Sequence, residues 1–237
     1  MSTLRLFPLN AVLFPGTALK LHVFEPRYKQ LLAECLDCGE AFGVCLIRDG
    51  DDAGDATVEP YDVGTTAEIA DVTPLPFGRF SVSTTGGRRF RILEIISREP
   101  YLLCDVEYLN EEVDGDGDDI DVLLERVRQE FREYLRLLVE YAGIASEIEV
   151  PPNPNSASYV IGHVLQVADP IKQRLLEISS TRQRLRIELD FLHRLLPQLR
   201  ALKDRRPAER ATEPRRPSGG AARTEQERYF GKYFSAN

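Results

Sequence analysis

The spacing of apolar residues changes once along the chain, and this change constrains the fold more than any other feature of the sequence. Over residues 1–110, apolar side chains alternate with polar ones in short runs such as Leu19, Leu21 and Val23, which is the pattern of half-buried strands. Over residues 120–203, they recur at every third or fourth position, as in amphipathic helices. The sequence therefore predicts an α+β protein, β-rich in its first part and helical in its second.

The first part also contains one predicted helix. Pro26 is suited to the first helical position, Glu25 precedes it, and Gly39 is suited to the residue that follows the helix. Phe24 and Tyr28 are expected to pack this helix on the sheet. The remaining strand-like runs are separated by turn residues and predict about seven short strands, which is typical of a small barrel or sandwich.

Four helices are predicted in the second part. They cover residues 120–141, 156–168, 170–178 and 181–203, and Pro197 is expected to kink the last one. Their apolar stripes must be buried against one another or against the β-rich part. This part is therefore expected to form a structural unit of its own.

An acidic run over residues 111–119 separates the two parts. It includes Gly115 and Gly117, and like charges with glycine predict a flexible linker. The repeated Asp-x-Asp pattern also suggests a calcium loop. Counted from Asp114, however, Asp119 occupies the sixth position, where such a loop needs glycine for its turn. The sequence favours the linker.

Residues 204–237 are rich in Arg, Ala, Pro, Ser and Gly, a composition that predicts a disordered basic tail. Four aromatic residues lie near its end, namely Tyr229, Phe230, Tyr233 and Phe234. In a helix they would form one apolar face, which could dock in a partner or in this chain's own binding groove. The alternative is a frayed terminus without a role.

The charge balance disfavours two classes of partner. The net charge is −8, from 30 Lys and Arg against 38 Asp and Glu, which opposes binding to nucleic acid or an anionic membrane unless basic residues cluster. Arg88, Arg89 and Arg91 form the one local cluster of the β-rich part. No apolar run reaches the roughly 18 residues that span a bilayer, and the N-terminus does not resemble a signal peptide. We therefore expect a cytoplasmic protein that binds neither membrane nor nucleic acid.

The sequence contains no recognisable catalytic motif. The P-loop pattern, Gly-x-Ser-x-Gly and His-Glu-x-x-His are all absent. Cys35 and Cys38 form a Cys-x-x-Cys pair that could be a redox dithiol or, with Cys45 and Cys104, a zinc site. Structural zinc sites usually bring a second closely spaced pair, however, and buried free cysteines are common. We therefore predict no metal, no cofactor and no enzymatic activity.

Arg128, Arg132 and Arg136 recur at every fourth position and share one face of a predicted helix. Such a stripe could bind an acidic partner. Glutamates are interspersed with it, however, and mixed charge is the norm on solvated helix faces. The sequence favours the solvated face.

Two specific motifs of the β-rich part are Phe14-Pro15-Gly16 and the segment Val-Phe-Glu-Pro-Arg-Tyr at residues 23–28. With them, the chain resembles the N-terminal domain of ATP-dependent Lon proteases. Further matches occur in the same order along the chain, at residues 7–9, 42–44, 63–69, 87–92, 100–102, 172–177 and 184–185. The resemblance covers about residues 4–200.

This resemblance implies a PUA-like β pseudobarrel with one helix over residues 1–110, followed by a C-terminal helical bundle over residues 120–203. It also implies recognition of unfolded or damaged polypeptides, in an adaptor or holdase role within protein quality control, with a protease or an ATPase as a further partner. The ATPase and protease motifs of full-length Lon are absent, so a stand-alone, non-enzymatic substrate-binding domain is expected. The alternative is a small-molecule or RNA-binding module, because PUA-like barrels include RNA binders.

The resemblance fixes no contact residues, so candidate binding residues must come from the pattern of turns. Leu75 and Phe77 are large apolar residues in a turn between two predicted strands, and exposed apolar residues often mark an interaction site. They are the predicted substrate-binding residues. The alternative is that Phe77 folds back onto the barrel, where it would only stabilise the fold.

Overall fold

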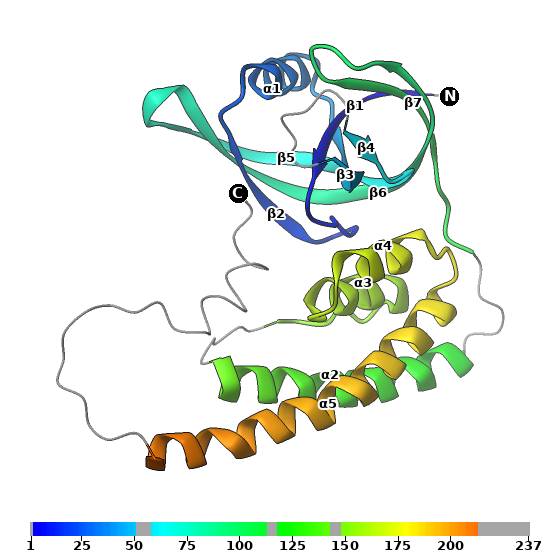
Figure 1. Cartoon of the computed structure of the whole chain (residues 1–237). Helices are drawn as coiled ribbons and strands as arrows, with labels where there is room; N and C mark the ends of the chain where they lie inside the picture. Colours follow the sequence, from blue (N-terminus) through cyan, green and yellow to red (C-terminus); the bar gives the residue numbers. More distant parts are fainter. Residues whose placement is uncertain (1, 51–57, 113–117, 143–147, 213–237) are drawn as a thin grey trace. The chain divides into compact units, whose positions relative to one another are not determined.

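The computed structural model describes residues 2–50, 58–112, 118–142 and 148–212 (Figure 1). Its elements are, in chain order, β1 (Ser2–Leu9), β2 (Ala18–Val23), α1 (Pro26–Cys38), β3 (Phe42–Asp49), β4 (Glu59–Pro60), β5 (Val63–Leu75), the short 3-10 helix η1 (Pro76–Gly78), β6 (Arg79–Ser97), β7 (Leu102–Tyr108), α2 (Asp118–Ala142), α3 (Pro154–Val164), α4 (Asp169–Glu177) and α5 (Thr181–Thr212). The chain therefore mixes helices and strands, as the sequence predicts.

The described residues fall into two compact units, and neither is continuous in sequence. The first contains the strands, helix α1 and residues 155–181, which include helix α4 and almost all of α3. The second contains α2, residues 148–154 and residues 182–212. One long helix therefore interrupts the sequence of the first unit.

This grouping differs from the sequence-based one in the placement of α3 and α4. Periodicity alone predicts a helical unit for them, but an apolar stripe can be buried against either helices or strands. Helix α5 also continues to Thr212, into the predicted tail, where Ala, Arg and Glu favour helix. The four aromatic residues of that tail lie outside the described residues. The predicted domain boundaries stay a prediction, at 1–110, 111–119, 120–203 and 204–237.

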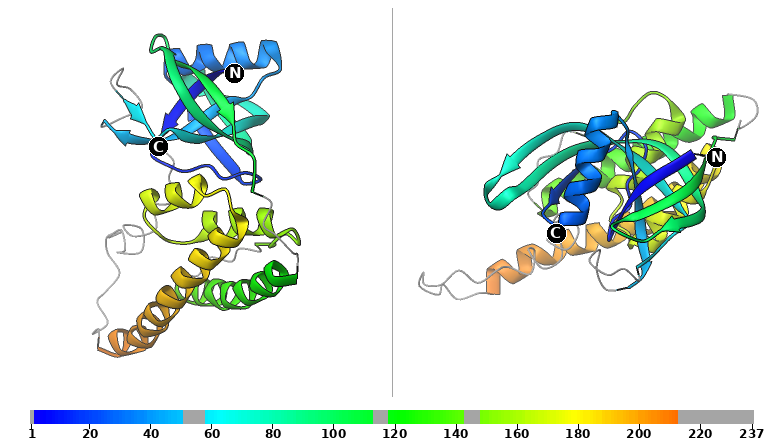
Figure 2. Two further views of the ribbon diagram at one scale, coloured as in Figure 1. Left: turned by 90° about the vertical axis from the view of Figure 1, so that its right-hand side faces the viewer. Right: turned by 90° about the horizontal axis from the view of Figure 1, so that it is seen from above.

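The strands form a seven-stranded, mostly antiparallel sheet that closes on itself. Its order is β1-β7-β6-β5-β3-β4, and β1 also pairs with β3, so that five strands make a closed strand ring. The β1–β3 pairing is parallel and the others are antiparallel. Strands β5 and β6 continue beyond the ring as a long hairpin, and β2 lies along β6 there (Figures 1 and 2).

One aromatic side chain fills part of the strand ring and leaves no room for side chains at two neighbouring glycine positions. Phe90 is fully buried, in a cluster that includes Leu6 and Val106. A Cβ atom at Gly43 or at Gly64 would lie 2.7 Å from the Cζ atom of Phe90. Because protein interiors are close-packed, the phenyl ring occupies the volume that larger residues at these two positions would need.

Helix α1 is delimited by local signals and buries one face. It begins at Pro26, directly after Glu25, and ends before Gly39, whose φ of 67° suits glycine. Tyr28 stacks on Phe7 of β1, with the ring centres 3.9 Å apart. The helix is thereby packed on the sheet close to its first turn.

The Phe-Pro-Gly turn after β1 is fastened to β6 by backbone hydrogen bonds. The N–H of Gly16 donates to the carbonyl oxygen of Gly86 at 2.7 Å, and the N–H of Gly86 donates to that of Thr17 at 2.8 Å. A Cβ atom at Gly86 would lie 2.1 Å from the carbonyl oxygen of Phe14, closer than any side chain allows. The motif therefore specifies a direct contact between two backbones.

One buried arginine joins helices α3 and α4 to the sheet. The Nη1 atom of Arg89, on β6, donates to the carbonyl oxygens of Leu176 and Ile178 at 2.7 and 3.1 Å, where α4 ends. Its Nε and Nη2 atoms lie 3.0 and 2.8 Å from Oε1 of Glu111. That carboxylate also accepts a hydrogen bond from the hydroxyl of Tyr159, on α3, at 2.6 Å. The Arg89 side chain is only 1% exposed.

The acidic run is anchored on both of its described sides. Glu111 makes the contacts just described, and the N–H of Glu112 donates to the carbonyl oxygen of Ser179 at 3.2 Å. Asp118 and Asp119 begin helix α2, where negative charge is favourable. Glu111 and Glu112 are therefore tied to the first unit, whereas the flexible linker over residues 111–119 stays a prediction. Residues 113–117 lie outside the described ranges.

Helices α2 and α5 of the second unit run in the same direction. Ion pairs between described residues connect them, among them Arg182–Asp119 at 3.5 Å, Arg200–Glu133 at 3.4 Å and Lys203–Glu140 at 2.6 Å. Residue numbers increase together along the two helices, as parallel axes require.

Within the described ranges, no helix combines the length and the apolar character that crossing a membrane would need.

A polar cluster connects α1 to β1. Arg5 donates from Nε to Glu34 at 3.1 Å and from Nη1 to Glu40 at 3.0 Å. The hydroxyl of Tyr101 also donates to Glu34. The hydrogen bond from Tyr101, followed by those from Gln30 and Arg5, holds the pKa of Glu34 below its ordinary value.

This lowered pKa should make stability depend on pH. The contribution of Glu34 to the free energy of unfolding is complete above the unfolded pKa, near 4.5, and is lost as the pH falls through the lower folded pKa. Glu34→Gln should therefore flatten the loss of stability between roughly pH 5 and 3. Urea unfolding at several pH values measures this, with Asp37→Asn on the exposed side of α1 as the control. An unaltered pH dependence in Glu34→Gln contradicts the prediction.

Candidate functional site

The tip of the β5–β6 hairpin exposes a large apolar side chain. Phe77, in η1, is 92% exposed, the highest value among the large apolar side chains described. Leu75 is half-buried at the end of β5, opposite Arg79. The structure therefore brings the two predicted binding residues together, and Phe77 does not fold back onto the strand ring. Their role in binding stays a prediction.

The backbone of Phe77 adopts an unusual conformation. Its φ of 64° and ψ of 30° lie in the left-handed region, which costs a residue with a side chain on the order of 1–3 kcal/mol. No other described residue except glycine has a positive φ. Arg79 stabilises the turn, since its Nε donates to the carbonyl oxygen of Pro76 at 3.1 Å and its guanidinium lies 5.8 Å from the centre of the Phe77 ring. Strain of this kind clusters at binding sites.

A second exposed aromatic residue, Phe24, lies beside the same hairpin. Val23 is the last residue of β2 and pairs with Phe80, so the antiparallel register brings Phe24 toward Arg79. Phe24 is 54% exposed, and the expectation that it packs α1 on the sheet is wrong. The strand alternation that turns Val23 inward turns the next residue outward. This signal was present in the sequence and could have identified Phe24.

Basic residues accompany these apolar ones. The Nζ atom of Lys29, in the first turns of α1, lies 3.8 Å from the position that a Cβ atom of Gly78 would take. We define the tip surface as Phe24, Leu75 and Phe77 together with Lys29 and Arg79. Its chemistry suits an apolar segment, with neutral or acidic residues beside it.

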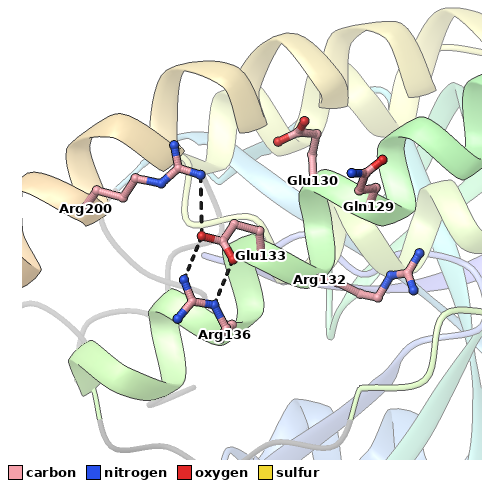
Figure 3. A pocket seen from close by; sticks show the side chains of 6 residues that line it. All are labelled: Gln129, Glu130, Arg132, Glu133, Arg136 and Arg200. Atoms are coloured by element: carbon pink, nitrogen blue, oxygen red, sulfur yellow. Dashed lines mark hydrogen bonds and ion pairs between the residues drawn. The ribbon is translucent and has the colours of Figure 1, made fainter.

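A hollow of about 490 Å³ lies along α2 and α5 of the second unit (Figure 3). Its lining residues are Gln129, Glu130, Arg132, Glu133, Arg136 and Arg200. The carboxylate of Glu133 accepts hydrogen bonds from Arg136 at 2.8 Å and from Arg200 at 3.4 Å, and these arginines lower its pKa to about 2. Glu133, Arg136 and Arg200 pair with one another, so the hollow is a weaker candidate than the tip surface.

The three clustered arginines of the β-rich part, Arg88, Arg89 and Arg91, make contacts within the fold. Arg89 is buried, as described above. Arg91 lies 2.9 Å from Glu107, and the guanidinium of Arg88 lies 4.3 Å from the centre of the Tyr108 ring. They do not form the open basic surface that nucleic acid needs.

The cysteines do not gather into a reactive site. Cys38 is exposed, whereas Cys35, Cys45 and Cys104 are buried. Burial raises the pKa of the Cys35 thiol to about 11 and that of Cys104 to about 12, which disfavours the thiolate that metal binding or redox chemistry uses. In the part of the chain that the structure describes, no three His, Cys, Asp or Glu side chains are placed to hold a metal ion.

Comparison with known families gives a match over most of the chain. Residues 3–194 match the model of the ATP-dependent protease La (LON) substrate-binding domain. The chain belongs to this family. Within this LON substrate-binding domain, the motif residues mostly build the fold: Gly16 bonds to β6, Pro26 begins α1 and Tyr28 is buried. Phe24 is the motif residue that lies on the tip surface.

Curated relatives of this LON substrate-binding domain are Lon proteases. Lon protease of Anaeromyxobacter dehalogenans (strain 2CP-C) is 26% identical over 195 residues, which are 81% of this chain and 23% of that protein. Lon protease 2 of Sorangium cellulosum (strain So ce56) is 29% identical over 202 residues, 82% of this chain and 25% of that protein. The chain thus spans about a quarter of the length of these relatives.

Solved structures share the fold. The Lon N-terminal domain protein from Xanthomonas campestris aligns with a TM-score of 0.58 and 26% identity, over 80% of this chain and 98% of that one. The N-terminal domain of Mycobacterium avium complex Lon protease aligns with a TM-score of 0.59 and 16% identity, over 81% and 98%. The fold of this LON substrate-binding domain is therefore that of Lon N-terminal domains.

Proposed function

We propose that this LON substrate-binding domain recognises polypeptides through the tip surface and catalyses no reaction. The observation that carries the proposal is Phe77, 92% exposed at a hairpin tip, with Leu75 and Phe24 nearby. Folded proteins bury their apolar segments, whereas unfolded or damaged ones expose them. Binding of such a segment to an exposed apolar surface lowers the free energy, because apolar area on both partners is removed from water.

The wider role that we propose is that of an adaptor or holdase in cytoplasmic protein quality control. A protease or an ATPase is the partner that would act on the bound polypeptide, as the likeness to Lon proteases suggests. We also infer that the strand ring is a PUA-like pseudobarrel and that the later helices correspond to a C-terminal bundle. The closed ring of five strands supports the first of these inferences.

The tip surface can be tested by removing its apolar side chains. Leu75→Ser combined with Phe77→Ser should weaken the binding of β-casein, an unfolded protein, by about tenfold or more, because each buried apolar side chain contributes roughly 1.5–3 kcal/mol. Fluorescence anisotropy of labelled β-casein measures the affinity. Stability should change little, since Phe77 is exposed and Leu75 is half-buried.

Ile96→Ser is the matched control. Ile96 is 51% exposed and lies near the opposite end of β6, so this variant loses apolar surface away from the tip and should keep its affinity. Equal affinities of the double variant and the parent protein would remove the tip surface from the proposal. An RNA pool that bound more tightly than β-casein would favour the alternative module.

A further inference from the structure

The part of the sheet that carries the tip surface has two edges. Among the strands that the structure describes, β2 pairs with β6 alone. Strand β5 pairs with β3 at residues 65–67 and, beyond them, with β6 alone among the described strands. A strand edge without a neighbour presents backbone N–H and C=O groups to which a further extended segment can bond. The two edges differ in how well they can do so.

The register shows which backbone groups of β2 face outward. In an antiparallel pair, residues alternately turn their N–H and C=O groups toward the partner strand and away from it. The N–H of Gly86 donates to the carbonyl oxygen of Thr17, so Thr17 faces β6. The backbone groups of Ala18, Lys20 and His22 therefore face away from β6. All three residues are exposed.

The corresponding edge of β5 is blunted. Pro74 pairs with Phe80, whose backbone groups face β2, so Pro74 lies at an outward-facing position and has no N–H to offer. The register also shifts between Ile69 and Asp71, and a bulge of this kind disturbs the alternation. Natural sheets use proline and bulges to prevent the addition of strands. Strand β2 has neither, and its pairing with β6 is regular from end to end.

The two faces of β2 indicate what the added segment should look like. On one face Leu21 and Val23 are buried in the apolar core of the first unit, so an added strand with apolar side chains on that side would extend the same layer. On the other face Lys20 and His22 are exposed, which favours neutral or acidic side chains there. Phe24, at the end of the edge, is positioned to contact the same segment.

We propose that β2 binds an extended segment of the polypeptide as an additional strand, with apolar residues at every second position. This inference rests on the proposed function and names the class of segment that it recognises. Backbone hydrogen bonds would supply affinity with little dependence on sequence, and the alternating side chains would supply selectivity. Apolar side chains of the same polypeptide could then reach the tip surface.

Amide hydrogen exchange measured by NMR, with and without saturating β-casein, tests the proposal. The outward-facing amides of Ala18, Lys20 and His22 should exchange at least about tenfold more slowly in the complex, because they gain a partner. The amides of Leu19 and Leu21 already face β6 and should change little. This alternation between neighbouring residues distinguishes strand addition from general shielding of the surface.

Lys20→Pro provides a second, independent measurement. Proline removes an outward-facing N–H and leaves the hydrogen bonds to β6 in place, so β-casein affinity should fall by about tenfold. Lys20→Ala keeps the N–H and removes only the charge, so it should lose clearly less affinity than Lys20→Pro. If Lys20→Pro does not fold by circular dichroism, hydrogen exchange in the parent protein decides.

Different experimental results would contradict the edge proposal and the proposed function. If β-casein binds and the amides of Ala18, Lys20 and His22 exchange as before, the edge proposal is wrong while the proposed function stands. If β-casein does not bind at all, the proposed function is wrong, and the edge proposal falls with it.

Discussion

Replacing Arg89 with alanine is expected to lower the free energy of unfolding by about 3–5 kcal/mol. The guanidinium donates to two carbonyl oxygens at the end of α4 and pairs with Glu111. Its removal takes a donor from each of these groups, removes a positive charge beside the carboxylate, and opens a cavity. Urea unfolding followed by circular dichroism measures the loss.

Two further variants show whether the contacts of the guanidinium group cause this loss of stability. Arg89→Lys should recover little of the lost stability, because one ammonium cannot reproduce the planar fork that reaches two carbonyls and a carboxylate together. Arg91→Ala, on the same strand, breaks an exposed ion pair with Glu107 and should cost no more than about 1 kcal/mol. Similar losses in Arg89→Ala and Arg91→Ala would contradict the interpretation.

Gly86→Ala is expected to lower the free energy of unfolding by about 3 kcal/mol or to prevent folding. The added Cβ atom would lie 2.1 Å from the carbonyl oxygen of Phe14. This neighbour is backbone, fastened on both sides of the turn by hydrogen bonds, so it cannot move aside as the end of a side chain could. Thermal unfolding and the yield of folded protein measure the effect.

Gly16→Ala separates steric conflict from backbone strain. Gly16 has a φ of 74°, but nothing lies within 4 Å of the position of its Cβ atom. Alanine there should cost roughly 1–2 kcal/mol, the usual penalty of the left-handed conformation. A greater loss from Gly16→Ala than from Gly86→Ala would show that the close approach to Phe14 is not limiting.

Features set by neighbouring residues could be predicted from the sequence. Pro26 and Gly39 delimit α1 through their own backbone preferences, and Leu75 and Phe77 were predicted from their place in a turn. Arg89 could be identified as a basic residue on a strand, but its partners at the end of α4 are distant in sequence. The anchoring of Glu111 and the placement of α4 with the strands depend on this same long-range contact, so periodicity and charge could not reveal them.

Only part of the candidate site could be predicted from the sequence. The motif that opens α1 predicts that Phe24 packs this helix on the sheet, although the alternation of β2 indicates an exposed position. The outward-facing amides of Ala18 and Lys20 depend on which strand β2 pairs with and in which register. A pattern of apolar residues shows which face of a strand is buried, but it does not show whether the strand has a neighbour on each side.

The discontinuous first unit has a consequence for how the chain is made. Its strands are complete in sequence by Tyr108, but residues 155–181 belong to the same unit. A ribosome makes the chain from its N-terminus, so the acceptors of the Arg89 side chain on α4 emerge only after the whole of α2. Until then Arg89 can pair with Glu111 but lacks the carbonyl oxygens of Leu176 and Ile178, so the strands leave the ribosome before the contacts that fasten α4 to them can form.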